Sequence, residues 1–192
     1  MRRFGCATSA MAVAAGLLLG LPAESRALGE MNGHLSVGVS QLFVSDSPGG
    51  SLSVGGGLDV PLGGQFRIGP AIGYHLLGSR TVDRGSLNAN VDYSVFEAAA
   101  LLHWLPPRLG PVGRVSAGPA LFLASAELST SGGAAAFSDL AVGEAVPGLA
   151  YEVTLMRRAP APVRVGLELG GRTGFLASTT WTVASARLAF HY

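Results

Sequence analysis

The feature that most constrains this chain is a regular alternation of apolar residues with small or polar ones along short segments. The alternation is clearest in residues 65–78 and 163–173, and residues 182–192 repeat it. A period of two places successive side chains on opposite faces of a β-strand. These segments therefore predict strands with one apolar and one polar face, joined by turns rich in Gly and Pro.

Eight segments of this kind follow one another along the chain. They span residues 33–44, 51–60, 65–78, 91–105, 112–127, 137–153, 163–173 and 182–192. Crossing a bilayer at a tilt takes about 9–11 strand residues, so segments of this length suffice. In the sixth segment the alternation changes parity near Pro147 and Gly148, which predicts a β-bulge there.

High hydropathy spread over short segments favours a membrane barrel. No stretch after residue 27 approaches the roughly 18 consecutive apolar residues of a transmembrane helix. In lipid every backbone polar group needs an internal partner, which a closed barrel provides. We therefore predict an all-β fold, an eight-stranded antiparallel up-and-down transmembrane β-barrel. The alternative is a soluble lipocalin-like barrel, in which the apolar face would point inward and the polar face outward. The polar face of these segments, however, contains no lysine and few charged residues that water would solvate.

The N-terminus has the pattern of a secretory signal peptide. Two arginines precede an apolar run, residues 10–21, and a small-x-small cleavage site ends at Ala27. This run is too short to span a bilayer. We expect cleavage near Ala27, so that residues 1–27 form the signal peptide and residues 28–192 form one barrel domain.

Composition excludes several functions for the mature chain. Cys6, the only cysteine, lies in the predicted signal peptide, which excludes disulfides and thiol chemistry. All basic residues are arginine, and the mature chain keeps ten of them against eleven acidic residues, a formal charge of −1. No basic patch indicates nucleic-acid binding. His75, His103 and His191 lie singly on different segments, so we expect no metal site, and no motif indicates a cofactor.

Two features resemble small bacterial outer-membrane β-barrel proteins of the porin-like class, in the size range of OmpX and OmpW. Glu97 precedes an apolar stretch, and the next strand carries an Ala-Gly-Pro kink at residues 117–119. The chain ends with apolar residues at every second position, Leu188, Phe190 and Tyr192, like the C-terminal assembly signal of these proteins. The resemblance implies location in the cell outer membrane, contact with its lipids, and recognition of the last strand by the barrel-assembly machinery.

Charged residues on the inward parity predict the content of the lumen. An eight-stranded barrel has an interior just wide enough for side chains to fill. Buried charges persist when they are paired, so we predict a lumen charge network with a structural role. Its predicted members are Arg67, Glu97, Arg114, Arg164, Glu168, Arg172 and Arg187. A narrow polar path for solutes is the alternative, because many inward positions are glycine.

An even strand number returns both ends of the barrel to one side, which we take to be the periplasm. Residues 79–90 and 128–137 then form extracellular loops that could hold an extracellular ligand, and Trp181 belongs to the outer aromatic belt. We expect a structural or surface-interaction role, with a narrow channel for small or hydrophobic solutes as the alternative and a lipid-modifying enzyme as the third possibility. His34 and Ser36 form the only close base–nucleophile pair and lack a suitably spaced acid, so we expect no catalysis.

Overall fold

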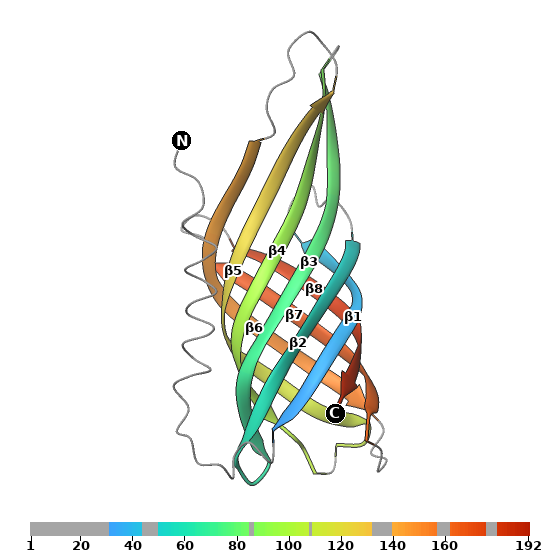
Figure 1. Cartoon of the computed structure of the whole chain (residues 1–192), viewed down its shortest axis with the longest axis vertical. Helices are drawn as coiled ribbons and strands as arrows, with labels where there is room; N and C mark the ends of the chain where they lie inside the picture. The colour runs from blue at the N-terminus through green and yellow to red at the C-terminus, as the bar shows by residue number, and fades with distance from the viewer. Residues whose placement is uncertain are drawn as a thin grey trace.

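The eight predicted segments form eight strands that close into a barrel, shown by the computed structural model in Figure 1. The structure describes residues 31–43, 50–84, 87–107, 109–131, 140–156, 162–175 and 180–192. The strands are β1 (Asn32–Phe43), β2 (Gly50–Gly63), β3 (Phe66–Arg84), β4 (Leu87–Trp104), β5 (Val112–Ser131), β6 (Leu140–Met156), β7 (Arg164–Phe175) and β8 (Thr180–His191). The predicted signal peptide and its cleavage site lie outside the described residues.

Every strand pairs antiparallel with its neighbours in sequence, and β1 closes the barrel against β8 from His34↔His191 to Phe43↔Thr182. The predicted fold class is confirmed. We call the end where β1 begins and β8 ends the base; it is the lower end in Figure 1. Among the described residues, no helix is long and apolar enough to cross a membrane.

The two faces of the wall have opposite polarity, as predicted. On the outside Leu35 and Val39 are 59% and 60% exposed, whereas Glu97 and Glu168 inside are 1% and 0% exposed. A water-soluble barrel would need the reverse arrangement, because exposed apolar rows are poorly hydrated and buried charges need partners. The lipocalin-like alternative therefore does not fit this wall.

The predicted extracellular loop at residues 79–90 is wrong, because β3 continues to Arg84 and β4 begins at Leu87. The register shifts between Leu76 and Ser79, and pairing then resumes from Ser79↔Asp92. Polar composition suggested a loop, but side chains such as Ser79 and Asp92 hydrogen-bond each other across the two strands. Similarly, β5 runs through the first residues of the predicted loop 128–137, to Ser131, and residues 132–137 lie outside the described residues.

These extensions form a wing that rises beyond the other four strands, as Figure 1 shows. We define the wing as residues 79–84 of β3, 87–93 of β4, 124–131 of β5 and 140–145 of β6. β2 pairs with β3 only as far as Ser53↔His75, and β7 pairs with β6 only from Gly148↔Gly174. The wing is therefore a sheet outside the closed part of the barrel.

The predicted bulge near Pro147 and Gly148 is also wrong, since β6 keeps one register with β5 from Leu128↔Leu140 to Arg114↔Thr154. Gly148 holds an inward position where a Cβ would lie 2.6 Å from Phe122 Cε2, so a glycine fits beside this ring. Pro147 is exposed and lies one residue beyond the end of the β6–β7 pairing. A residue without an N–H is tolerated at such an edge.

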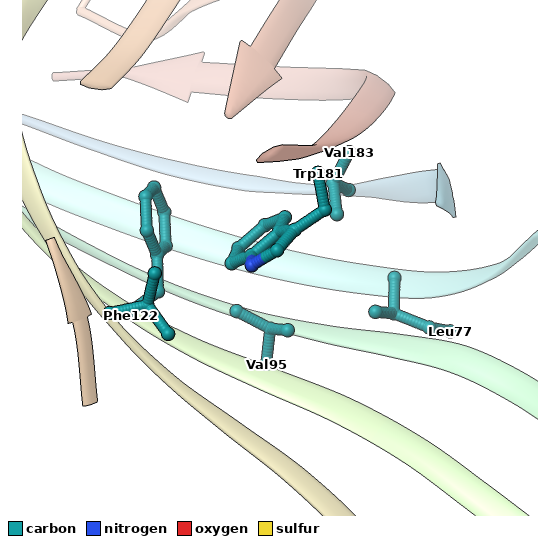
Figure 2. Close-up of a cluster of buried hydrophobic side chains, with 6 residues drawn as sticks. Leu77, Val95, Phe122, Trp181 and Val183 are labelled. Carbon is teal, nitrogen blue, oxygen red and sulfur yellow. The ribbon is translucent and has the colours of Figure 1, made fainter. Parts of the chain in front are cut away.

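Trp181 points into the lumen and not into an outer aromatic belt, which corrects the prediction for this residue. It is 7% exposed, and its ring packs edge-on against Phe122 with centroids 5.0 Å apart. Figure 2 shows these two rings with their apolar neighbours. The apolar cluster consists of Leu77, Val95, Phe122, Val146, Trp181 and Val183.

Candidate functional site in the polar lumen

The base half of the lumen is lined by charged side chains that come from seven strands. They lie on inward positions because the two-residue period fixes one face of each strand toward the axis. The acidic members are Asp59, Glu97, Glu152 and Glu168, and the basic members that pair with them are Arg67, Arg114, Arg172 and Arg187. We call these eight residues the lumen charge network. Its formal charge is zero.

Glu152 is the hub of this network. Its Oε2 accepts hydrogen bonds from Arg172 Nη2 at 3.3 Å and from Arg187 Nη2 at 3.4 Å, and its Oε1 accepts one from Arg114 Nη2 at 3.2 Å. The side chain is 4% exposed. Sequence reasoning missed Glu152 because the assumed parity change at Pro147 hid its inward position. An unbroken count of every second residue from Val146 would have found it.

The remaining pairs extend the network on both sides of Glu152. Arg172 Nε donates to Glu97 Oε2 at 2.8 Å, and Arg187 forms an ion pair with Glu168. Arg114 also approaches Glu168, with a nitrogen–oxygen distance of 3.7 Å.

Toward the base, Arg67 pairs with Asp59, and Arg114 lies 3.7 Å from the same carboxylate. Both arginines were predicted members of the network, whereas Asp59 was not among them. Arg164, a further predicted member, is half-buried at the start of β7 and has no ion pair within the described part of the chain.

All four histidines face the lumen, although they are scattered in the sequence. His34 stacks on His191 with ring centroids 5.5 Å apart, and its Nδ1 accepts a hydrogen bond from Arg114 at 3.4 Å. His103 Nδ1 lies 2.8 Å from the Ser116 hydroxyl. The barrel thus gathers side chains that are up to 157 positions apart in the sequence, which single-segment motifs cannot reveal.

Two groupings in the lumen have the composition of reactive sites. Ligand atoms of His34, Glu152 and Glu168 lie within 4.8 Å of one another, a donor set that could hold a metal ion. Both carboxylates, however, are already paired with Arg114 and Arg187, whose positive charges oppose a cation at the same place. This geometry is that of an ion-pair network.

The second grouping is Ser53, His75 and Glu97, which are 1%, 0% and 1% exposed. His75 Nε2 lies 3.2 Å from Glu97 Oε2, and Ser53 is the cross-strand neighbour of His75. The residue types are those of a nucleophile, a base and an orienting acid. The Ser53 hydroxyl and His75 Nδ1 have no hydrogen-bond partner among the described residues. All three side chains are shielded from the solution by the wall and by the neighbouring lumen side chains, so this grouping is not accessible to a substrate.

The apolar cluster lies directly above the lumen charge network on the side of the wing. On β3, β4 and β8 the polar residues His75, Glu97 and Ser185 are each followed, two positions nearer the wing, by Leu77, Val95 and Val183. Two layers of different chemistry therefore fill the lumen in series, one ionic and one apolar.

Comparisons with known proteins bear on the fold. Neither protein-family models nor curated protein sequences give a match. Among solved structures, neisserial surface protein A has a TM-score of 0.59 at 12% identity, covering 84% of this chain and 96% of that one. Ail of Yersinia pestis, solved with the heparin analogue sucrose octasulfate, has a TM-score of 0.47 at 11% identity, with coverages of 85% and 99%. The N-terminal barrel domain of Pseudomonas aeruginosa OprF gives 0.43 at 13% identity, with coverages of 85% and 98%. The similarity to the neisserial protein shows that this chain shares the fold of a small eight-stranded β-barrel.

Proposed function

We propose that this protein is an integral β-barrel of the bacterial outer membrane with a structural or surface-interaction role, carried by the wing. The observation that carries this proposal is a reversal of polarity between the wall and the wing. Along the wall the outer face is apolar and the inner face is charged. On the wing the outer face is polar, and the inner face is largely apolar but carries Arg80 opposite Val91 and Glu144 opposite Ala124.

Outward positions locate this reversal within a few residues. The exposed wall residues Leu76 and Phe96 are apolar, whereas Ser79 and Asp92, the next pair toward the wing, form a hydrogen bond on the outer face. Asn90 Nδ2 donates to Asp92 Oδ1 at 3.2 Å on the same face. Because lipid cannot solvate such groups, the hydrocarbon layer ends at this level and the wing stands in water.

The inner face of the wing continues the apolar cluster outward. Val91, Tyr93 and Leu128 are half-buried on this face, and Tyr93 packs against the cluster. The wing therefore offers a polar outer face and a partly covered apolar inner face to an extracellular ligand. We assign the surface interaction to the wing, which includes the strand residues of the two predicted loops.

The last strand supports recognition by the barrel-assembly machinery. Leu188, Phe190 and Tyr192 point outward and are 53%, 40% and 57% exposed. Tyr192 exchanges two backbone hydrogen bonds of 3.0 Å with Gly33, which joins the end of the chain to the first strand. An exposed apolar row on a strand that closes the barrel is a suitable feature for an assembly factor and for lipid contact.

The filled lumen argues against the alternative functions. A narrow channel would need a continuous path, but both the lumen charge network and the apolar cluster lie across the axis. A lipid-modifying enzyme would need an accessible nucleophile, and Ser36 and Ser53 are both buried. We therefore propose no transport and no catalysis.

Cysteine labelling tests the proposed membrane topology, because the mature chain has no cysteine of its own. Thr81→Cys places a thiol on the exposed face of the wing, and Leu109→Cys places one in the turn at the base, where Leu109 is 48% exposed. A maleimide that cannot cross membranes should label Thr81→Cys in intact cells and Leu109→Cys only after lysis. The unsubstituted protein should stay unlabelled once Cys6 has been removed with the signal peptide.

The opposite labelling order would contradict the orientation. Labelled protein recovered from the soluble periplasm, with the same migration on SDS gels before and after boiling, would contradict the membrane barrel itself.

A further inference from the structure

Among the described residues of the closed part of the barrel, the inward positions carry one arginine more than the acidic residues there match. Within the lumen charge network each carboxylate has an arginine partner, and the formal charges cancel. Arg164 is a fifth arginine on the inward parity and the first residue of β7. It is half-buried and has no ion pair among the described residues. Within the described part of the chain, Arg164 therefore leaves an unmatched positive charge at the mouth of the lumen at the base.

His191 lies directly opposite Arg164 in the β7–β8 ladder. The imidazole is 6% exposed, and its Nε2 has no hydrogen-bond partner within the described part of the chain. A buried polar atom without a partner is destabilising, so a partner from outside the chain is favoured there. Stacking on His34, whose Nδ1 is held by Arg114, fixes the orientation of the ring.

We propose that this mouth binds an oxyanion of the phosphate class between Arg164 and His191. A guanidinium presents two parallel N–H groups to phosphate oxygens, and the imidazole Nε2 adds a donor on the neighbouring strand. Arg114 and Arg67 lie further inside and are ion-paired with Glu152 and Asp59, so the charge that attracts the anion comes from Arg164. Arg164 begins its strand and is only half-buried, so an anion reaches its guanidinium from the solution at the base without passage through the filled lumen.

Free phosphate and the phosphodiester of a lipid headgroup share this chemistry, so the experiment has two arms. In the first, the mature protein is refolded in a neutral maltoside detergent and titrated with inorganic phosphate by isothermal calorimetry. We expect saturable binding to the unsubstituted protein. Binding should weaken about tenfold or more in Arg164→Gln and in His191→Phe, which keeps an aromatic ring for the stack on His34.

Arg80→Gln, an arginine change on the wing at the far end of the barrel, serves as the matched control and should bind phosphate like the unsubstituted protein. Heat-modifiable migration on SDS gels verifies that each variant is folded. In the second arm the titration is repeated in phospholipid nanodiscs. Loss of phosphate binding there identifies a lipid headgroup as the occupant, and its persistence identifies a free anion.

Two results would overturn the proposal. One is the absence of phosphate binding to the folded protein in detergent. The other is equal affinity of the unsubstituted protein, Arg164→Gln and His191→Phe, which would place any bound phosphate elsewhere. Neither result depends on the topology of the barrel in the membrane. The phosphate site can therefore be disproved while the proposed function stands.

Discussion

At the scale of single residues, Glu152 has the largest electrostatic role in the lumen because three guanidinium groups share its carboxylate. Neutralising it removes the acceptor charge from Arg114, Arg172 and Arg187 at once and leaves the lumen with an excess positive charge. Removing one partner of a buried ion pair typically costs about 3–5 kcal/mol. The expected result for Glu152→Gln is a loss of unfolding free energy of this order, measured by urea denaturation of the barrel in lipid vesicles.

The control for this variant is Glu127→Gln, which changes the same functional group on the exposed outer face of the wing. Its effect should stay within about 0.5 kcal/mol, as for most surface substitutions. Equal unfolding free energies for the two variants would show that the lumen charge network does not stabilise the barrel.

At the scale of the strands, two Gly-Pro pairs shape the wall in a related way. A Cβ at Gly69 would overlap the carbonyl oxygen of Leu58, and a Cβ at Gly118 would overlap that of Ala100. The following prolines, Pro70 and Pro119, have no N–H to give to a ladder. The β2–β3 and β4–β5 pairings are both interrupted at these positions. The two pairs therefore let neighbouring backbones approach closely where the barrel curves.

Substitution of Gly118 tests this role. We expect Gly118→Ala to destabilise the barrel by about 1–3 kcal/mol, because the added methyl group must displace backbone and not a flexible side chain. Gly143→Ala on the neighbouring strand is the control, since a Cβ there meets its nearest atoms at 3.9 Å and fits. Unfolding midpoints of the two variants in urea would give the comparison. A Gly118→Ala barrel as stable as Gly143→Ala would mean that the close approach can relax freely.

The strands also show how far sequence reasoning reaches. Regular alternation predicted all eight elements and, except for β6 beyond Pro147, the face of each, because a period of two needs only local information. The ends of β3 and β4 were missed, since polar residues such as Ser79 and Asp92 pair across strands in water as well as they form loops. The prediction also placed Trp181 in the outer aromatic belt and not in the lumen. Its ring partner, Phe122, comes close to it only when the barrel closes, which the local sequence does not show. Pairing between distant strands decides these features.

At the scale of the whole molecule, the two layers that fill the lumen should act as seals in series. Ions crossing the barrel would have to leave water at the apolar cluster, where a hydrophobic constriction excludes water, and then pass between arginines and carboxylates that bind one another. We expect no stepwise current when the purified protein is inserted into planar lipid bilayers.

Breaching one layer should leave the other intact. The double variant Phe122→Ala, Trp181→Ala opens the apolar cluster but keeps every ion pair beneath it, so it too should remain silent. Adding Arg172→Ala removes contacts of 2.8 Å and 3.3 Å to Glu97 and Glu152, and current should appear in this triple variant. Current through the double variant would show that the apolar cluster alone blocks the lumen. Current through the unsubstituted barrel would support the channel function, because ions would then have a path through the lumen.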